Sequence, residues 1–258
     1  MNNIWAVATV VIKELYRRKD FYVLFILTAV LTLVAGSVNF FNDDRIVRYV
    51  KEICLLLIWI ASLVVAITMA ARHIPMERES RTIFPLLAKP ITRTEVLLGK
   101  FLGCWLACWL ALALFYLFFG VICLTREKEW LILNYVQAML LHGFMLGIVT
   151  ALALLGSLIF AAPSSTTTIL LIVCTSILMV GRHLNKVAVQ QPEPQQTLLT
   201  AVYYVIPHLE LFDVRDLIIH NWPLVPWGVC LGAMLYASAY TAFFLAVACL
   251  VFRRKVLT

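Results

Sequence analysis

Long apolar runs separated by short charged stretches dominate the pattern of this chain. A helix needs about 20 mostly apolar residues to cross about 30 Å of hydrocarbon. Six runs meet this requirement with almost no charge inside them, since one charge at a helix centre costs about 2.5–3.5 kcal/mol on insertion scales. These runs are residues 21–41, 53–71, 97–124, 130–162, 163–181 and 225–252. The pattern predicts an all-α polytopic membrane protein, with six transmembrane helices forming one transmembrane domain over residues 1–258.

Composition supports this class, because 63% of the residues are hydrophobic and only 14% are charged. Soluble domains are about 45–50% apolar and about 25% charged. The seven cysteines lie in or beside the apolar runs without a C-x-x-C pair. We interpret them as small packing residues rather than as a disulfide or zinc framework.

Basic residues are unevenly distributed between the two sides of the predicted bundle. Residues 1–20, the stretch 72–100 and the segment Arg253–Lys255 carry most of the 21 Lys and Arg residues. Short loops rich in Lys and Arg stay on the cytoplasmic side of a membrane. We therefore expect a multi-pass protein of the bacterial cytoplasmic (inner) membrane with both termini in the cytoplasm.

Residues 1–20 have the spacing of an amphipathic helix rather than of a seventh span. Apolar residues from Ile4 to Tyr16 recur at helical spacing, and Lys13 lies elsewhere on the wheel. This predicts a helix in the cytoplasmic interface of the membrane, with lipids as partners. The alternative is a cytoplasmic extension of the first span. The candidate interfacial residues are Trp5, Lys13, Tyr16, Arg17 and Arg18.

The outer segment 182–224 contains an apolar piece, Thr197–Phe212, that is interrupted by Pro207 and is too short to span. We expect a re-entrant or capping element over the outer ends of the helices. A cluster of titratable residues begins near the end of this piece and continues beyond it. It is either a metal or hydrolase site or, as we favour, a solvated rim in which Arg215 pairs with an acid. Its members are His208, Glu210, Asp213, Asp216 and His220.

Some polar residues and glycines lie inside the apolar runs. Polar groups avoid lipid, so they predict either a conduit or dimer interface or plain hydrogen bonding between helices. The polar candidates are Thr28, Thr32, Asn39, Thr168 and Thr175.

Glycines four residues apart let helices approach closely. These pairs are Gly99 and Gly103, Gly143 and Gly147, and Gly228 and Gly232, and Gly156 is a further bend or contact point in the overlong fourth run. His142 is the one histidine within a span, and we interpret it as a hydrogen-bonded packing residue.

The stretch 72–96 joins the second and third runs and is the most charged part of the chain. Pro75 is expected to break the second span or to open a new helix. Charged residues and then an apolar face follow, as in a short surface helix that fits a cleft on a partner protein. The alternative is a helix resting on the headgroups. Thr92 and Glu95 have capping-box spacing and predict the start of the third span.

Motifs in this stretch resemble those of a known family. Residues 77–82 read E-R-E-S-R-T, residues 86–93 read L-L-A-K-P-I-T-R, and Gly99-Lys100 follows. This order is similar to the signature of ABC exporter permeases of the second exporter type. The piece Pro207–Phe212 is similar to one found in relatives that serve copper-enzyme maturation.

The resemblance implies a transport subunit whose coupling helix lies between spans two and three. ATP and Mg would bind to two copies of a separate ABC ATPase, and this chain would hold no cofactor. A second permease, identical or paralogous, would complete the dimer, and no nucleic acid is expected. The residues that it assigns to ATPase coupling are Glu77, Arg78, Glu79, Arg81, Thr82, Phe84, Leu86, Pro90 and Arg93.

Enzyme motifs do not change this interpretation, since no phosphate-binding loop, H-E-x-x-H or G-x-S-x-G is found. The chain is therefore not expected to be an enzyme. Two alternatives stay open. One is an intramembrane lipid-modifying enzyme that uses His142 or the outer histidines, and the other is a non-transporting membrane anchor for an ATPase.

Overall fold

The computed structural model describes residues 2–17, 44–79, 91–124, 131–160, 162–190 and 192–254, with positions 22, 26, 29 and 30. These residues form helices and connecting segments, and the described ranges contain no strand. This confirms the all-α class. The helices are α1 (Asn2–Arg17), α3 (Asp44–Glu79), α5 (Arg93–Leu124), α6 (Ile132–Ile159), α7 (Pro163–Val189), α8 (Gln195–Val205), the 3-10 helix η1 (Leu209–Phe212), α9 (Arg215–Ile219) and α10 (Trp227–Arg254).

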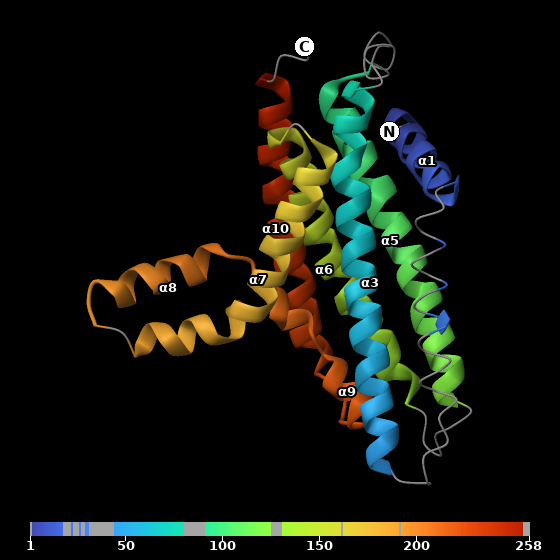
Figure 1. Ribbon diagram of the computed structural model, residues 1–258, viewed down its shortest axis with the longest axis vertical. Coiled ribbons are helices and arrows are strands. Elements are labelled where there is room, and N and C mark those ends of the chain that lie inside the picture. Colours follow the sequence, from blue (N-terminus) through green and yellow to red (C-terminus); the bar gives the residue numbers. More distant parts are fainter. Residues whose placement is uncertain are drawn as a thin grey trace.

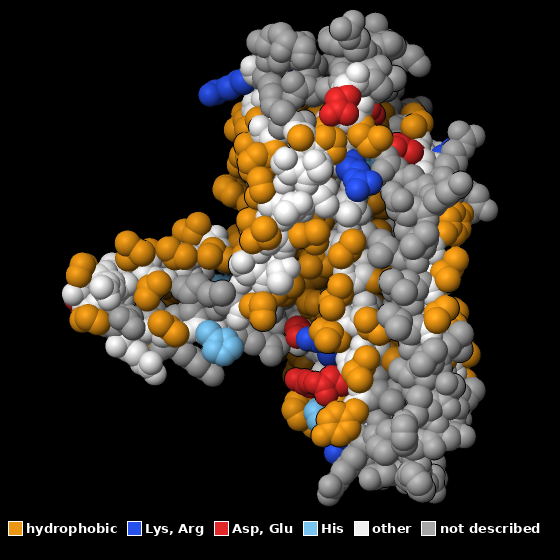
Figure 2. Space-filling model, viewed as in Figure 1, with side chains coloured by type: hydrophobic (Ala, Val, Ile, Leu, Met, Phe, Trp, Pro, Cys, Tyr) orange, Lys and Arg blue, Asp and Glu red, His pale blue; other side chains and the backbone are white. Residues whose placement is uncertain are grey.

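Four of the described helices are long and apolar enough to cross a membrane. They are Lys51–Glu77, Arg93–Leu124, Ile132–Ile159 and Trp227–Arg254, and Pro163–Met179 is a shorter apolar helix. The first predicted span, 21–41, lies largely outside the described residues, so the count of six stays a prediction. Figure 2 shows apolar side chains over most of the described part of the visible face.

The long helices run side by side, with the start of α1 and the end of α10 at the same end of the bundle (Figure 1). We call this end, where α3 and α10 finish and α5 begins, the terminal end. The opposite end holds the start of α3, the end of α5 and the start of α6. α6 packs against α3, α5, α7 and α10, and most of its side chains are buried. α6 is therefore the central helix of the bundle.

Glycines of α6 allow this packing. A side chain on Gly143 would collide with the Trp109 ring of α5, and Trp105 Nε1 donates a hydrogen bond to the Gly143 carbonyl at 2.9 Å. A Cβ on Gly147 would lie 3.1 Å from Trp105 Nε1. The sequence prediction that these glycines are close-contact points is confirmed.

Pro75 does not interrupt α3, which continues through it to Glu79. The prediction of a break at this residue is wrong. Proline removes one backbone donor, but side chains on both sides of Pro75 hold the last turns in place. His73 faces Glu14 of α1, and Glu77 forms an ion pair with Lys100 of α5.

The outer segment consists of two parts with different packing. The C-terminal part of α7 turns away from the bundle and pairs with α8 as a side arm (Figure 1). No α8 residue is buried. η1 and α9 instead pack on the bundle and bury side chains from Leu209 to Ile219. The expected capping contact is therefore made by η1 and α9, and not by the 197–205 portion.

Candidate functional site

The terminal end brings together residues from four helices around the predicted coupling stretch. Glu77, in the last turn of α3, forms an ion pair with Lys100, which lies two turns into α5. Only 2% of the Lys100 side chain is exposed, against 31% for Glu77. A buried ammonium group needs such a partner because desolvation penalises an unpaired charge. The pair therefore joins the two helices that lead into and out of residues 80–92.

Helix α1 packs on the first turns of α5. A Cβ on Gly99 would lie 2.7 Å from Val7 Cβ, and one on Gly103 would lie 2.6 Å from Val11 Cβ. Carbon atoms in contact are normally about 3.5–4.0 Å apart, so only glycine permits this approach. The predicted close contact at Gly99 and Gly103 is thus made within the chain, by α1.

The exposed face of α1 carries two of the expected interfacial residues, Trp5 and Lys13. Trp5 is 62% exposed, and Val10 and Lys13 are exposed as well. Exposed apolar side chains beside an exposed lysine fit contact with the headgroup region of a membrane. Tyr16 and Arg17 belong to the helix, but their side chains and Arg18 lie outside the described part.

Arg93 joins the start of α5 to the end of α10. Its guanidinium donates hydrogen bonds to the carbonyls of Phe252 and Arg253 at 2.9 and 3.4 Å and lies over the Phe252 ring. In return, Arg253 donates to Thr94 Oγ1 at 3.2 Å. Carbonyls at a helix C-terminus lack intrahelical donors and favour a cation. Arg93 thus has a structural role beside the coupling role that the resemblance implies.

The predicted capping box at the start of α5 is present. The Thr92 amide donates to the Glu95 carboxylate at 2.8 Å, and the Glu95 amide donates to Thr92 Oγ1 at 3.2 Å. These two bonds satisfy two backbone donors and define where α5 begins.

The rest of the predicted coupling set divides into two groups. Glu79 is exposed at the end of α3, and Arg78 belongs to the helix without a described side chain. Five further candidates lie outside the described residues, namely Arg81, Thr82, Phe84, Leu86 and Pro90.

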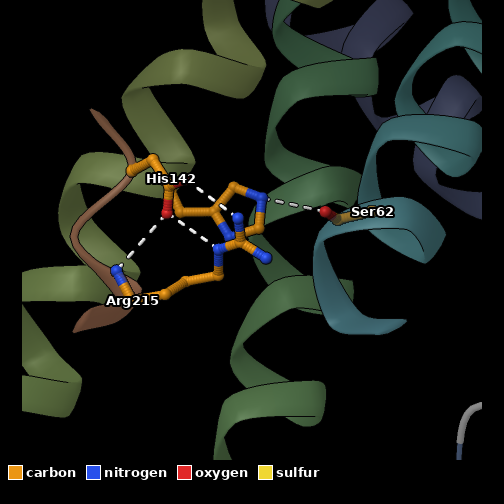
Figure 3. A network of polar contacts seen from close by, with 4 residues as sticks. Ser62, His142 and Arg215 are labelled. Atoms are coloured by element: carbon orange, nitrogen blue, oxygen red, sulfur yellow. Dashed lines mark hydrogen bonds and ion pairs between the residues drawn. The ribbon is translucent and has the colours of Figure 1, made fainter. Parts of the chain in front are cut away.

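A second polar site lies inside the bundle, around His142 (Figure 3). The Ser62 hydroxyl lies 3.0 Å from the Trp59 carbonyl, to which it donates, and 2.9 Å from His142 Nε2. Which of these two atoms donates in the Ser62–His142 hydrogen bond depends on the tautomer of His142. His142 Nδ1 has no hydrogen-bond partner among the described residues. The Trp59 ring stacks on the imidazole, with centroids 4.5 Å apart.

The expected pairing of Arg215 with an acid is confirmed. Its Nε and Nη2 donate to the two Asp213 oxygens at 2.8 and 2.9 Å, and its guanidinium lies over the Trp59 ring. Figure 3 shows the Arg215 side chain beside the His142 ring. The hydrogen bonds to Asp213 raise the pKa of Arg215 above its usual value, so the guanidinium stays charged.

The other outer histidines take part in local packing. The His208 ring lies near the rings of Tyr203 and Tyr236, with centroids 4.2 and 6.2 Å away, and its Nδ1 is 3.5 Å from Glu210. His220 and Asp216 are exposed. Within the described residues, no group of three His, Cys, Asp or Glu side chains is arranged to hold a metal.

Three buried polar side chains at the opposite end were missed by the sequence analysis. Lys51 of α3 donates to the Ile218 carbonyl at 2.9 Å. Asn134 and Gln137 of α6 donate to the carbonyls of Leu217 and Val225 at 3.1 and 2.8 Å. Each lies in or beside an apolar run, and this was the signal that could have identified them. Together they fix the segment 215–226 to the bundle.

The polar conduit candidates are only partly described. Thr168 and Thr175 of α7 are exposed, and Thr168 Oγ1 donates to the Ser164 carbonyl at 3.1 Å. That bond satisfies the hydroxyl within its own helix. Thr28, Thr32 and Asn39 lie outside the described residues.

The fold and composition define a multi-pass helical membrane protein with a junction of helix ends beside a charged loop. A family model described as "ABC-2 family transporter protein" matches residues 5–257. The chain therefore belongs to the ABC-2 family of transporter proteins and is an ABC transporter membrane subunit. A search of curated proteins finds no match.

Proposed function

We propose that this chain is the permease of an ABC exporter and that residues 80–92, with Glu79, form the surface that contacts a separate ATPase. Hydrolysis of ATP, with its Mg²⁺, takes place in two copies of that ATPase. A second permease, identical or paralogous, completes the transport pathway. The membrane is the bacterial inner membrane, and the terminal end faces the cytoplasm.

One observation supports this proposal most strongly. The two helix ends that flank the loop between α3 and α5 contact each other and neighbouring helices. The Glu77–Lys100 pair joins α3 to α5, and Arg93 joins α5 to the end of α10. α1 packs on the same turns of α5. A force applied to this loop would therefore reach several helices together, as coupling requires.

The lipid-modifying alternative has no comparable support. The His142 side chain is fully buried, with 0% exposure, and Nε2 is engaged by Ser62. A lipid substrate would have to displace this packing before it could reach the imidazole. The anchor alternative shares the ATPase contact and differs only in transport, so it is decided by measuring transport rather than binding.

The experiment compares two exposed acidic residues at opposite ends of α3, Glu79 and Glu52. The chain is co-expressed with the ABC ATPase that co-purifies with it, and permease-dependent ATP hydrolysis is measured in nanodiscs. Glu79→Arg should weaken ATPase binding and reduce the stimulated hydrolysis, whereas Glu52→Arg should leave both unchanged. Equal effects of the two variants, or no co-purifying ATPase, would refute the proposed contact surface.

A further inference from the structure

We propose that Lys100 is a positioning residue that fixes the spacing of the two helix ends from which the coupling loop extends. This inference rests on the proposed function and assigns a mechanical part of it to one side chain. The residue would not contact the ATPase. It would act through Glu77, by keeping α3 and α5 in register when the loop is pushed.

Burial is the first argument for this role. Lys100 is among the largest fully buried side chains of the described residues. A lysine is an unfavourable choice for filling apolar space, because burying an ammonium group costs free energy that a leucine or methionine would not lose. A buried pair of charges is thus weak evidence that the pair stabilises the fold. It is better evidence that the pair sets the relative position of the two helices that carry it. Here it specifies which turn of α3 lies beside which turn of α5.

The position of the pair is the second argument. Glu77 is two residues from the end of α3, and Lys100 is seven residues after the first residue of α5. Seven residues are about two helical turns, or about 10 Å of rise. The contact therefore lies a short distance inside the bundle from the loop, where it constrains both helix ends without occupying the exposed surface.

The neighbourhood of Lys100 is the third argument. Gly99, the preceding residue, lies against Val7 and the Ile4 carbonyl of α1. His73, one turn before Glu77, faces Glu14 of α1 with its Nδ1 at 3.6 Å from the carboxylate. The Glu77–Lys100 pair thus closes a contact among three helices, so that α1, α3 and α5 would move together.

The matched control for Lys100 is Lys51, which is also buried, with 4% exposure, but lies at the opposite end of the bundle. Its ammonium donates hydrogen bonds to the Ile218 carbonyl and to Asn221 Oδ1. Lys100→Met and Lys51→Met remove the same group from similar burial. A general loss of stability would appear in both variants.

The test uses the complex of the full chain with its co-purifying ABC ATPase in nanodiscs. Lys100→Met should bind the ATPase as the unchanged chain does and keep KM for ATP, while the permease-stimulated kcat falls about tenfold, which is about 1.4 kcal/mol. Lys51→Met should keep kcat. Lys100→Arg, which retains the charge, and the exchange Glu77→Lys with Lys100→Glu should each restore most of it.

A second measurement does not depend on the ATPase. Spin labels at Glu79 and Thr92, both exposed, report the spacing of the two helix ends in the chain alone. Lys100→Met should broaden this distance distribution, and Lys51→Met should not. An unchanged distribution, or an unchanged kcat with intact ATPase binding, would overturn the role of Lys100. If no ATPase responds to the unchanged chain, the proposed function fails whatever the labels show.

Discussion

The contact between α1 and α5 depends on Gly103, and the variant Gly103→Ala tests this dependence. The added methyl carbon would lie 2.6 Å from Val11 Cβ and 2.9 Å from the Ala8 carbonyl oxygen. The first atom belongs to a β-branched side chain and the second to the backbone. Neither can rotate away, so α1 as a whole would have to shift outward.

The size of the effect follows from these distances. Restoring an ordinary carbon–carbon contact of about 3.5 Å requires a shift of about 1 Å, and such a gap forfeits a quarter to a half of each dispersion contact. The buried side chains that lose contact are those of Val7, Ala8 and Val11. Overpacking of this kind typically costs about 1–3 kcal/mol. Replacing a helical glycine with alanine returns about 0.5–1 kcal/mol. We expect a net destabilisation of about 1–2 kcal/mol.

The assay is reversible unfolding of the purified chain in mixed micelles as the fraction of denaturing detergent rises. The control is Gly232→Ala in α10, where a Cβ would have nothing within 4 Å. This variant should be neutral or slightly stabilising, because only the helix-propensity gain applies. If Gly103→Ala were as stable as Gly232→Ala, the close contact of α1 with α5 would be refuted.

Three further predictions concern polar contacts. A double-mutant cycle of Ser62→Ala and His142→Phe should give a coupling energy of about 0.5–1.5 kcal/mol in the same unfolding assay, as for a typical buried hydrogen bond; a value near zero would exclude the bond. Arg93→Ala should speed amide exchange in the last turn of α10 while leaving the middle of that helix unchanged, because the terminal carbonyls lose their donor; equal rates in both proteins would contradict the assigned contact. Lys51→Met should speed exchange around Ile218 with little effect at the terminal end, since only the opposite end loses a hydrogen bond; a uniform change along the chain would count against a local role.

Much of the helical architecture follows from local sequence. The apolar runs around α5, α6 and α10 predicted helices whose ends agree within a few residues with the observed ones. Thr92 and Glu95 predicted a capping box that is present. In these cases the determining interactions lie within one or two helical turns, so the spacing along the chain is sufficient to identify them.

Contacts between distant parts of the chain were not predictable in the same way. The resemblance assigned Glu77 and Arg93 to ATPase coupling, and it did not indicate the partners that both residues have within the chain. Lys51 precedes the second apolar run, and its position in the sequence does not indicate that it binds the Ile218 carbonyl. Which helix faces which residue depends on packing of the whole bundle, and helical periodicity does not specify this. The continuous α3 has the same explanation, because the groups that hold its last turns belong to α1 and α5.

The segment that closes the opposite end and helix α1 at the terminal end are held to the bundle by different kinds of contact, and this difference bears on how α1 takes part in movement. At the opposite end, Lys51, Asn134 and Gln137 bind backbone carbonyls of one connected segment. Several such bonds to one segment must break together, so that end resists rearrangement. At the terminal end, α1 is joined to α3 through His73 and a Glu14 side chain that is 42% exposed, and pairs this accessible contribute only about 0–1 kcal/mol. The attachment of α1 therefore depends mainly on apolar packing against α5. Such packing keeps α1 and α5 together while single polar contacts around them are exchanged. Helices that transmit a movement of the coupling loop need to stay together in this way.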